Sequence, residues 1–229
     1  MEQEDINFSD FIASSIHDMK NSLNIQIGFL YELMSECQGK LDKPMLDRLG
    51  QAVYEASRMN VNLMQILSLY KLGKSIYPMD IAEQSVNEIL EEVVLQNQSI
   101  MDYKGIAVEV SCEENCYWYF DRDLVTGILI NALNNAYQYT TNKIHLLAKI
   151  RDGMLEIRVE DNGGGYPESM LLKNVAENKG ICFATGSTGL GFYFSSRVAM
   201  MHKNEGRQGN VSIANGGTHN GGCFVLTLP

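Results

Sequence analysis

The sequence lacks an excess of basic residues. Its 229 residues include 18 lysines and arginines against 28 aspartates and glutamates, for a formal net charge of −10 at pH 7. Proteins that hold nucleic acid through its phosphates need clustered basic side chains, so this composition argues against a nucleic-acid partner. An acidic chain can still bind an anionic nucleotide through backbone N–H groups or a metal ion.

Long apolar runs are missing as well. No stretch approaches the roughly 18 residues that a transmembrane helix needs, and the N-terminus MEQEDINFSD is acidic and polar. We therefore expect no membrane span, no signal peptide and a cytoplasmic location. Only eight residues precede the first expected helix, so a sensory input would come from a partner in trans or is missing from this chain.

Cysteines are few and do not form an even set. Cys37, Cys112, Cys116, Cys182 and Cys223 are scattered along the chain, which favours free thiols in a reducing compartment. Three residues separate Cys112 from Cys116, but no second pair and no neighbouring histidine completes a zinc site.

Two long amphipathic helices are predicted first, over residues 9–39 and 44–73. Both carry apolar or neutral residues at alternating steps of four and three, which is a heptad pattern. The first seam comprises Ile12, Ile16, Met19, Leu23, Gln26, Leu30, Leu33 and Cys37, and the second comprises Leu46, Leu49, Val53, Ala56, Asn60, Leu63, Leu67 and Tyr70. Two such helices joined by a short loop form an antiparallel hairpin.

A helical hairpin alone cannot enclose a core. We therefore expect it to pair with a second copy into a dimeric four-helix bundle, in which the polar Asn60 fixes the register. Packing of the hairpin on the rest of its own chain is the alternative. GKSIYPMD then breaks the pattern and predicts two domains, residues 1–75 and 76–229.

The second domain mixes helices and short strands. An amphipathic helix is predicted over 81–103 and two more over 123–139 and 189–202, while strands are predicted over 106–110, 117–120, 143–150, 154–161, 210–215 and 223–229. Asp152-Gly153 is a typical hairpin turn between two of these strands. The pattern indicates an α+β sandwich.

Three stretches of this domain suggest a nucleotide site. Asn131 and Asn135 are four residues apart and share a helix face, and amide oxygens can bind Mg²⁺. A solvated polar face would also explain them. VEDNGGGYP places Asp161 at a strand end, where a carboxylate can accept a hydrogen bond from the exocyclic amine of adenine. The glycines beside it let the backbone approach a flat base.

The third stretch, ATGSTGLGFYF, has Gly186, Gly189 and Gly191 at the start of a helix. Glycine-rich helix N-termini present N–H donors and the positive end of the helix dipole to phosphate. It has neither the Gly-Lys-Ser/Thr of a Walker loop nor the preceding strand of a Rossmann fingerprint.

Taken together, these pieces resemble the N, G1 and G2 boxes of the histidine-kinase ATPase domain, and GGTHNGGCFVLTLP resembles the closing G3 region. HDMKNSL, from residue 17, is similar to the H box of the same family. Residues 9–229 therefore resemble a two-component sensor histidine kinase catalytic core: a dimerisation and phosphotransfer hairpin, then an ATP-binding domain of the Bergerat type.

The resemblance implies a protein histidine kinase. His17 would be autophosphorylated from ATP and would pass the phosphoryl group to an aspartate of a response-regulator receiver domain, with Asp18 orienting the imidazole. Asn21, one turn after His17, would position a water for phosphatase activity. The implied ATP and Mg²⁺ site comprises Asn135 as metal ligand and Asn131, Asp161, Gly163, Gly165, Gly189, Leu190 and Gly191 as nucleotide-binding residues.

The sequence departs from the family pattern in several places. Ser22 replaces the H-box proline, so the first helix lacks that kink. Gln138 stands where the family often has a basic residue, and the missing phosphate contact would come from elsewhere, with Lys179 as a candidate. The segment 167–186 is short, and Phe183 is the candidate for the family's F-box phenylalanine.

Two other functions stay open. A histidine phosphotransfer intermediate would keep the hairpin but lose the nucleotide boxes, which are all present here. A regulatory pseudokinase would bind ATP without phosphorylating His17, and Gln138 leaves room for it. ATP hydrolysis of the chaperone or topoisomerase type is disfavoured because HDMKNSL would then have no role.

Overall fold

The computed structural model describes residues 8–37, 40–73, 78–171 and 189–229, and the side chains from residue 14 onward within these ranges. The chain divides into two compact units, Met1–Tyr77 and Pro78–Pro229. The division falls two residues beyond the predicted boundary between 75 and 76. None of the described helices is long and apolar enough to cross a membrane.

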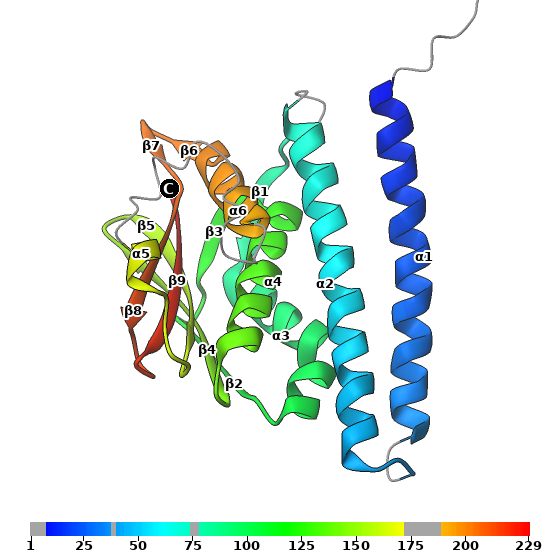
Figure 1. The fold of residues 1–229 in the computed structure, drawn as a ribbon. Coiled ribbons are helices and arrows are strands. Elements are labelled where there is room, and N and C mark those ends of the chain that lie inside the picture. Colours follow the sequence, from blue (N-terminus) through cyan, green and yellow to red (C-terminus); the bar gives the residue numbers. More distant parts are fainter. Residues whose placement is uncertain (1–7, 38–39, 74–77, 172–188) are drawn as a thin grey trace, which may run out of the picture. The chain divides into compact units, whose positions relative to one another are not determined.

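The first unit is a pair of long helices, α1 (Phe8–Cys37) and α2 (Lys43–Gly73), which run antiparallel (Figure 1). Helix α1 continues without interruption through Ser22, as expected where the proline is absent. The amide of Asn60 donates a hydrogen bond to Asn24 Oδ1 at 2.9 Å, which joins the two helices across their contact. A polar pair at such a position restricts the alignment of two helices that apolar contacts alone would leave free to slide.

Much apolar surface of this helix pair remains uncovered. Two residues of the predicted seam, Met19 and Leu33, are 47% and 48% exposed. Among the side chains that the structure describes, the other large apolar ones exposed on these two helices are Ile25, Phe29, Met45, Met59 and Ile66. Single exposed apolar residues are common, but a group of them along two neighbouring helices is typical of an interaction surface.

The second unit is built around one five-stranded sheet in the order β2-β4-β5-β9-β8. Strand β2 pairs parallel to β4, and the other pairs are antiparallel. Two small ribbons, β1–β3 and β6–β7, complete the strands. The elements are β1 (Ile81–Ser85), α3 (Val86–Lys104), β2 (Ala107–Cys112), β3 (Tyr117–Asp121), α4 (Arg122–Tyr139), β4 (Lys143–Arg151), β5 (Met154–Asp161), α5 (Glu168–Leu171), α6 (Leu190–Met201), β6 (Lys203–Asn204), β7 (Arg207–Gln208), β8 (Asn210–Gly216) and β9 (Gly221–Leu228).

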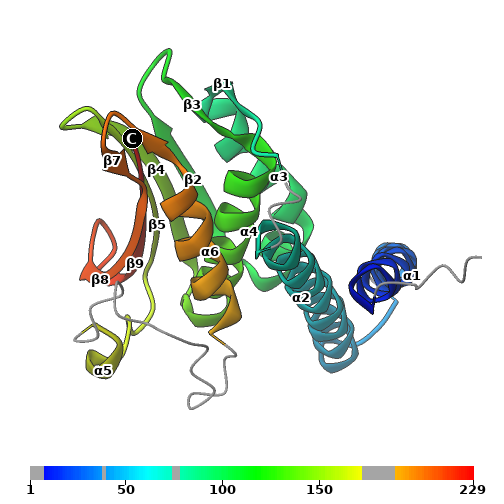
Figure 2. The same cartoon turned by 90° about the horizontal axis from the view of Figure 1, so that it is seen from above.

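Helices α3, α4 and α6 lie on one face of this sheet (Figure 2). The strands alternate accordingly: Ile144, Leu146 and Ala148 of β4 are buried, whereas the residues between them are more exposed. Ile128 and Leu129 of α4 complete the core between the layers. The predicted α+β sandwich is confirmed, with α4 packed directly on the strand that ends at Asp161.

One predicted element is wrong. Residues 81–85, expected as the first turns of a helix, form strand β1, and Ile81 to Ser85 pair with Asp121 to Tyr117. The helix begins at Val86 because the Ser85 hydroxyl accepts a hydrogen bond from Glu88 N at 3.5 Å and caps it. The strand depends on a partner more than 30 residues away, which local periodicity does not reveal.

Candidate functional site

His17, the predicted phosphorylation site, lies on the exposed surface of α1 with Asp18 and Asn21 beside its ring. Its side chain is 62% exposed. Asp18 Oδ1 lies 3.7 Å and Asn21 Nδ2 lies 3.4 Å from His17 Nδ1, so both neighbours approach the same ring nitrogen. Turning the Asn21 amide would bring its oxygen to the ring, and both side chains would then favour a proton on Nδ1. That tautomer leaves the lone pair of Nε2 available as a nucleophile.

The two asparagines of α4 have different environments. Asn131 is 8% exposed and donates to Ser195 Oγ at 3.4 Å, and the Ser195 hydroxyl donates to Gly191 O at 2.8 Å. A Cβ at Gly191, in the first turn of α6, would lie 2.0 Å from Asn131 Oδ1, so a larger residue there would displace the Asn131 side chain. Asn131 therefore fixes the start of α6 against α4. Asn135, one turn later on the same face, is half-buried and remains the more accessible amide.

Asp161 ends β5 and is 7% exposed. Its Oδ1 accepts a hydrogen bond from Gly163 N at 2.7 Å. On the other side lies β9, where a Cβ at Gly222 would come within 2.7 Å of Asp161 Oδ2 and one at Gly221 within 2.6 Å of Oδ1. The carboxylate is thus packed against glycine backbone, and a larger residue at Gly221 or Gly222 would collide with it.

Gly163 has a second constraint. A Cβ at this residue would lie 2.0 Å from the carbonyl oxygen of Tyr139, the last residue of α4. The backbone after β5 therefore passes in direct contact with the end of α4. This approach brings the end of the helix that carries Asn131 and Asn135 next to Asp161.

Two asparagines that were not predicted from the sequence, Asn162 and Asn215, stabilise the backbone around Asp161 through hydrogen bonds. Asn162 Oδ1 accepts hydrogen bonds from the backbone N–H groups of Thr141, Asn142 and Lys143 at 3.2, 3.0 and 3.0 Å, which joins the α4–β4 connection to β5. Asn215 of β8 binds both backbone groups of Tyr166: Tyr166 N donates to Oδ1 at 2.7 Å, and Nδ2 donates to Tyr166 O at 2.9 Å.

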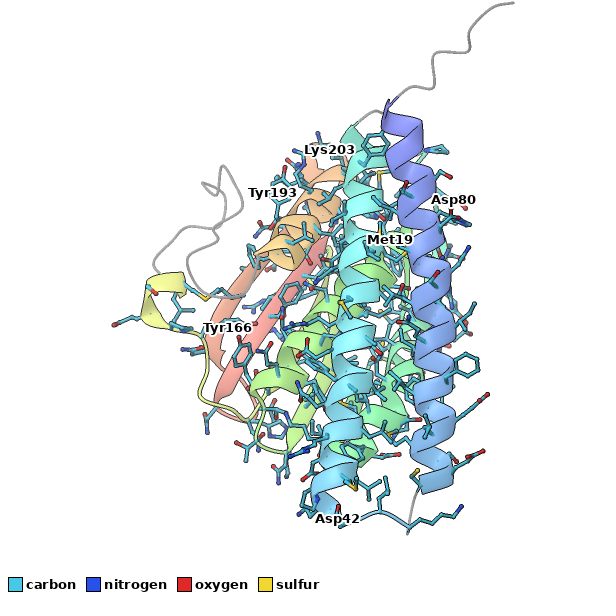
Figure 3. The ribbon with its side chains drawn as sticks, turned by 45° about the vertical axis from the view of Figure 1, so that its right-hand side comes forward. Met19, Asp42, Asp80, Tyr166, Tyr193 and Lys203 are labelled. Atoms are coloured by element: carbon cyan, nitrogen blue, oxygen red, sulfur yellow. The ribbon has the colours of Figure 1, made fainter. Side chains whose placement is uncertain are left out.

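Gly165 and Tyr166 depend on this second contact. Gly165 adopts a φ of +75°, and a Cβ there would lie 2.7 Å from Asn215 Oδ1. Burial raises the pKa of Tyr166, and the charge of Asp161 raises it further, so its hydroxyl stays protonated in the physiological range. Figure 3 labels Tyr166 beside the sheet. Tyr166 is an aromatic wall for the region around Asp161 that the sequence did not single out.

Gly189 to Gly191, the predicted phosphate-binding segment, form the start of α6. Gly189 has φ 60° and ψ −1°, the left-handed conformation that glycine adopts without strain, and α6 begins at Leu190 without a side-chain cap. The first-turn N–H groups of a helix have no partner within the helix and can bind phosphate. The candidates Lys179 and Phe183 lie outside the described residues, and Gln138 is exposed on α4.

The turn between β8 and β9 is held by Glu160, the residue before Asp161 on β5. Glu160 is 1% exposed and its Oε2 accepts a hydrogen bond from Thr218 N at 2.7 Å. Burial by itself would raise the pKa of Glu160, but the hydrogen bonds from Thr218 and the charge of Arg158 lower it overall. An ionised Glu160 therefore holds the turn that leads into Gly221 and Gly222.

The chain is similar in sequence to known histidine kinases. Residues 120–229 match the family described as histidine kinase-, DNA gyrase B-, and HSP90-like ATPase. The sensor-like histidine kinase SenX3 of Mycolicibacterium smegmatis is 24% identical over 96% of this chain and 57% of its own length. Sporulation kinase B of Bacillus subtilis is 23% identical over 96% and 49%, respectively. The chain thus spans about half the length of these curated relatives.

Solved structures agree in fold. Full-length ShkA in complex with AMPPNP matches with a TM-score of 0.63 at 20% identity, over 96% of this chain and 45% of that one. The histidine kinase AdeS of Acinetobacter baumannii matches with a TM-score of 0.58 at 17% identity, over 93% and 96%. The arrangement of a helical hairpin followed by an ATPase-type sandwich is therefore shared with these kinases.

Proposed function

We propose that this chain, a histidine-kinase catalytic core whose residues 120–229 belong to the histidine kinase, DNA gyrase B and HSP90 ATPase family, phosphorylates His17 from ATP. The phosphoryl group then passes to an aspartate of a response-regulator receiver domain. The observation that carries this proposal is that one chain holds both an exposed histidine flanked by Asp18 and Asn21 and a segment that matches the ATPase family and contains Asp161.

The chemistry at His17 follows from its contacts. The lone pair of Nε2 attacks the γ-phosphorus of ATP, a P–N bond forms, and the bond from phosphorus to the bridging oxygen breaks as ADP leaves with the electron pair. Positive charge develops on the ring during attack. Asp18, 3.7 Å from Nδ1, stabilises that charge and then favours release of the Nδ1 proton.

The nucleotide-binding residues fit an adenine nucleotide. The Asp161 carboxylate would accept a hydrogen bond from the exocyclic amine of the base, with the backbone of Gly163 and Gly165 beside it and Tyr166 as a wall. Gly189, Leu190 and Gly191 would present N–H groups to the phosphates. Because Asn131 fixes the start of α6 against α4, we assign it mainly to positioning these groups.

Asn135 would hold Mg²⁺, because its amide is the more accessible of the two and hard oxygen ligands suit this ion. When bound, Mg²⁺ neutralises charge on the phosphates. We expect Asn135→Ala to weaken binding of Mg·ATP by about 1–2 kcal/mol, the typical value of a lost polar contact, and to change binding of metal-free ATP much less. Titration calorimetry with and without Mg²⁺ measures both; equal losses would remove Asn135 from the metal site.

A test of the whole proposal needs only the purified chain and γ-labelled ATP. Label that is lost in acid but stable in base identifies a phosphoramidate on histidine rather than a phosphoester. Transfer to a purified receiver domain then measures the second step. Tight ATP binding without any acid-labile label would instead identify a regulatory protein that binds ATP, the alternative that Gln138 leaves open.

We further propose that the chain is a homodimer through α1 and α2. The support is the uncovered apolar surface of these helices, including the seam residues Met19 and Leu33. Leu33→Glu would place a charge in the centre of the proposed bundle. We expect the dissociation constant of the dimer to rise at least tenfold, because a buried unpaired carboxylate costs several kcal/mol.

Light scattering at micromolar concentration measures this effect. Leu95→Glu is the matched control, because Leu95 is 75% exposed on α3, outside the helix pair, and the same charge there should leave the mass unchanged. A parent protein that is monomeric at this concentration, or a Leu33→Glu protein that is as dimeric as the parent, would contradict the proposal.

A phosphatase activity toward the phosphorylated regulator is a second candidate function. The observation that favours it is Asn21, whose amide lies 3.4 Å from His17 Nδ1 on the same exposed helix face. An amide both donates and accepts hydrogen bonds, so it can orient a water for attack on an aspartyl phosphate. We expect Asn21→Ala to slow dephosphorylation of the regulator at least tenfold while His17 is still labelled. Equal rates of dephosphorylation by the parent and the variant, with ATP removed, would contradict this role of Asn21.

A further inference from the structure

The segment that follows β5 is bonded by a side chain where a strand residue would be bonded by a neighbouring strand. Strand β5 ends at Asp161, and no strand of the described residues pairs with Tyr166, five residues later. Instead, the amide of Asn215 accepts a hydrogen bond from Tyr166 N at 2.7 Å and donates one to Tyr166 O at 2.9 Å. Two residues of an antiparallel sheet exchange the same pair of bonds. One side chain thus satisfies both backbone groups of Tyr166.

The amide of Asn215 also lies against the residue before Tyr166. All three heavy atoms of the amide lie within 3.0 Å of the point that a Cβ at Gly165 would occupy. A larger residue at this position would therefore push the amide away. On the other side Pro167 follows, and the residue before a proline is restricted to extended conformations. The backbone of Tyr166 is thus constrained from both sides.

The cross-strand partner of Asn215 makes room for the ring of Tyr166. Asn215 of β8 pairs with Gly222 of β9. A Cβ at Gly222 would lie 3.1 Å from Cε2 and 3.4 Å from Cδ2 of Tyr166, and 2.7 Å from Oδ2 of Asp161. The ring and the carboxylate therefore approach the same point above Gly222. One cross-strand pair bonds the backbone of Tyr166 and accommodates its ring beside Asp161.

Asn215 contributes little to the core of the second unit. Its side chain is exposed, and β8 is an edge strand that pairs with β9. The buried contact of β8 comes from Val211, which is 1% exposed. The two hydrogen bonds of the Asn215 amide therefore stabilise the segment around Tyr166 rather than the β8–β9 hairpin itself.

We propose that Asn215 is a positioning residue for nucleotide binding and acts through Tyr166. It fixes the ring as the wall against which the base lies while the Asp161 carboxylate binds the base. This role rests on the proposed binding of ATP around Asp161. Asn215 is assigned no contact with the phosphates or with His17, so its loss should raise the KM for ATP and leave kcat of His17 labelling near the parent value.

The effect on affinity follows from the loss of order in the free protein. Without the amide, the backbone N–H and C=O of Tyr166 bond to water, and the ring is free to leave Gly222. The wall then has to be ordered each time that a nucleotide binds. A site that is only part of the time in its binding-competent form has a correspondingly higher apparent dissociation constant.

A double-mutant cycle on the full chain tests whether Asn215 acts through the ring. We expect Asn215→Ala to raise the dissociation constant of ATP at least fivefold in calorimetry, and Tyr166→Ala to raise it at least as much. Once the ring is absent, adding Asn215→Ala should change the dissociation constant less than twofold. Effects of the two substitutions that multiply would overturn the proposal.

Amide hydrogen exchange provides a second measurement, which needs no nucleotide. The N–H of Tyr166 bonds to Asn215, so we expect it to exchange at least fivefold faster in the Asn215→Ala protein. Asn215→Asp keeps the acceptor for this N–H and loses the donor to Tyr166 O. It should therefore retain most of the protection of the N–H and give a dissociation constant between those of the parent and Asn215→Ala.

Asn210→Ala is the matched control. Asn210 lies at the other end of β8, and its exposed side chain has no hydrogen-bond partner among the described residues, so this variant should match the parent in both measurements. A parent that binds ATP, with an unchanged dissociation constant in Asn215→Ala, would overturn the role of Asn215 alone. A parent that does not bind ATP would contradict the proposed function and, with it, this role.

Discussion

His17→Gln is expected to abolish acid-labile labelling from γ-labelled ATP while nucleotide binding is retained. Glutamine keeps similar length and polarity on an exposed helix surface but has no nitrogen lone pair that can attack phosphorus. The proposed nucleotide site around Asp161 belongs to the other compact unit, Pro78–Pro229, so calorimetry should give the parent Kd for ATP. Labelling and binding are measured on the same preparation.

His145→Gln is the matched control. His145 lies on β4, where its Nε2 is 2.8 Å from Ser111 Oγ, and it has no part in the proposed reaction. It should leave labelling unchanged. Full label in the His17→Gln protein, or a loss of label only in the His145→Gln protein, would show that the phosphorylated histidine had been assigned wrongly.

The sequence predicted the elements that depend on local pattern. The heptads of α1 and α2, the apolar face of α4 and the turn at Asp152-Gly153 are local signals, and each element is present. Strand β1 was missed because IAEQS continues the amphipathic pattern of the following helix. Its strand conformation comes from pairing with Tyr117–Asp121, a contact that is distant in sequence.

The candidate site shows the same limit. Asp161, Gly163 and the two asparagines of α4 were predicted as site residues from their chemical type and their order along the chain, because such groups have few other reasons to occur together. Asn162 and Asn215 were not found, since an asparagine in a turn or at a strand end is common. Their importance arises from partners 19 to 21 and 49 residues away, respectively. The separate structural role of Asn131 likewise became visible only through Ser195 and Gly191.

Gly163→Ala is expected to weaken ATP binding at least tenfold and to destabilise the second unit. The added Cβ would lie 2.0 Å from the carbonyl oxygen of Tyr139, and a backbone atom at the end of α4 cannot rotate away as a side chain could. Relief requires the segment after β5 to move away from α4. Overpacking of this kind typically costs about 1–3 kcal/mol or more. The same movement would break the 2.7 Å hydrogen bond from Gly163 N to Asp161 Oδ1 and so displace the proposed adenine acceptor.

The neighbouring glycine provides the control. Gly164→Ala adds the same methyl group one residue later, where no atom lies within 4 Å of the new Cβ, and it should bind ATP and unfold like the parent. Calorimetry gives the two dissociation constants, and thermal denaturation gives the two stabilities. If Gly163→Ala and Gly164→Ala behave alike in both measurements, then the close approach of β5 to α4 does not determine the geometry around Asp161. A loss of stability in Gly163→Ala with unchanged ATP affinity would confine the role of this contact to folding, and Asp161 would then have to bind adenine without it.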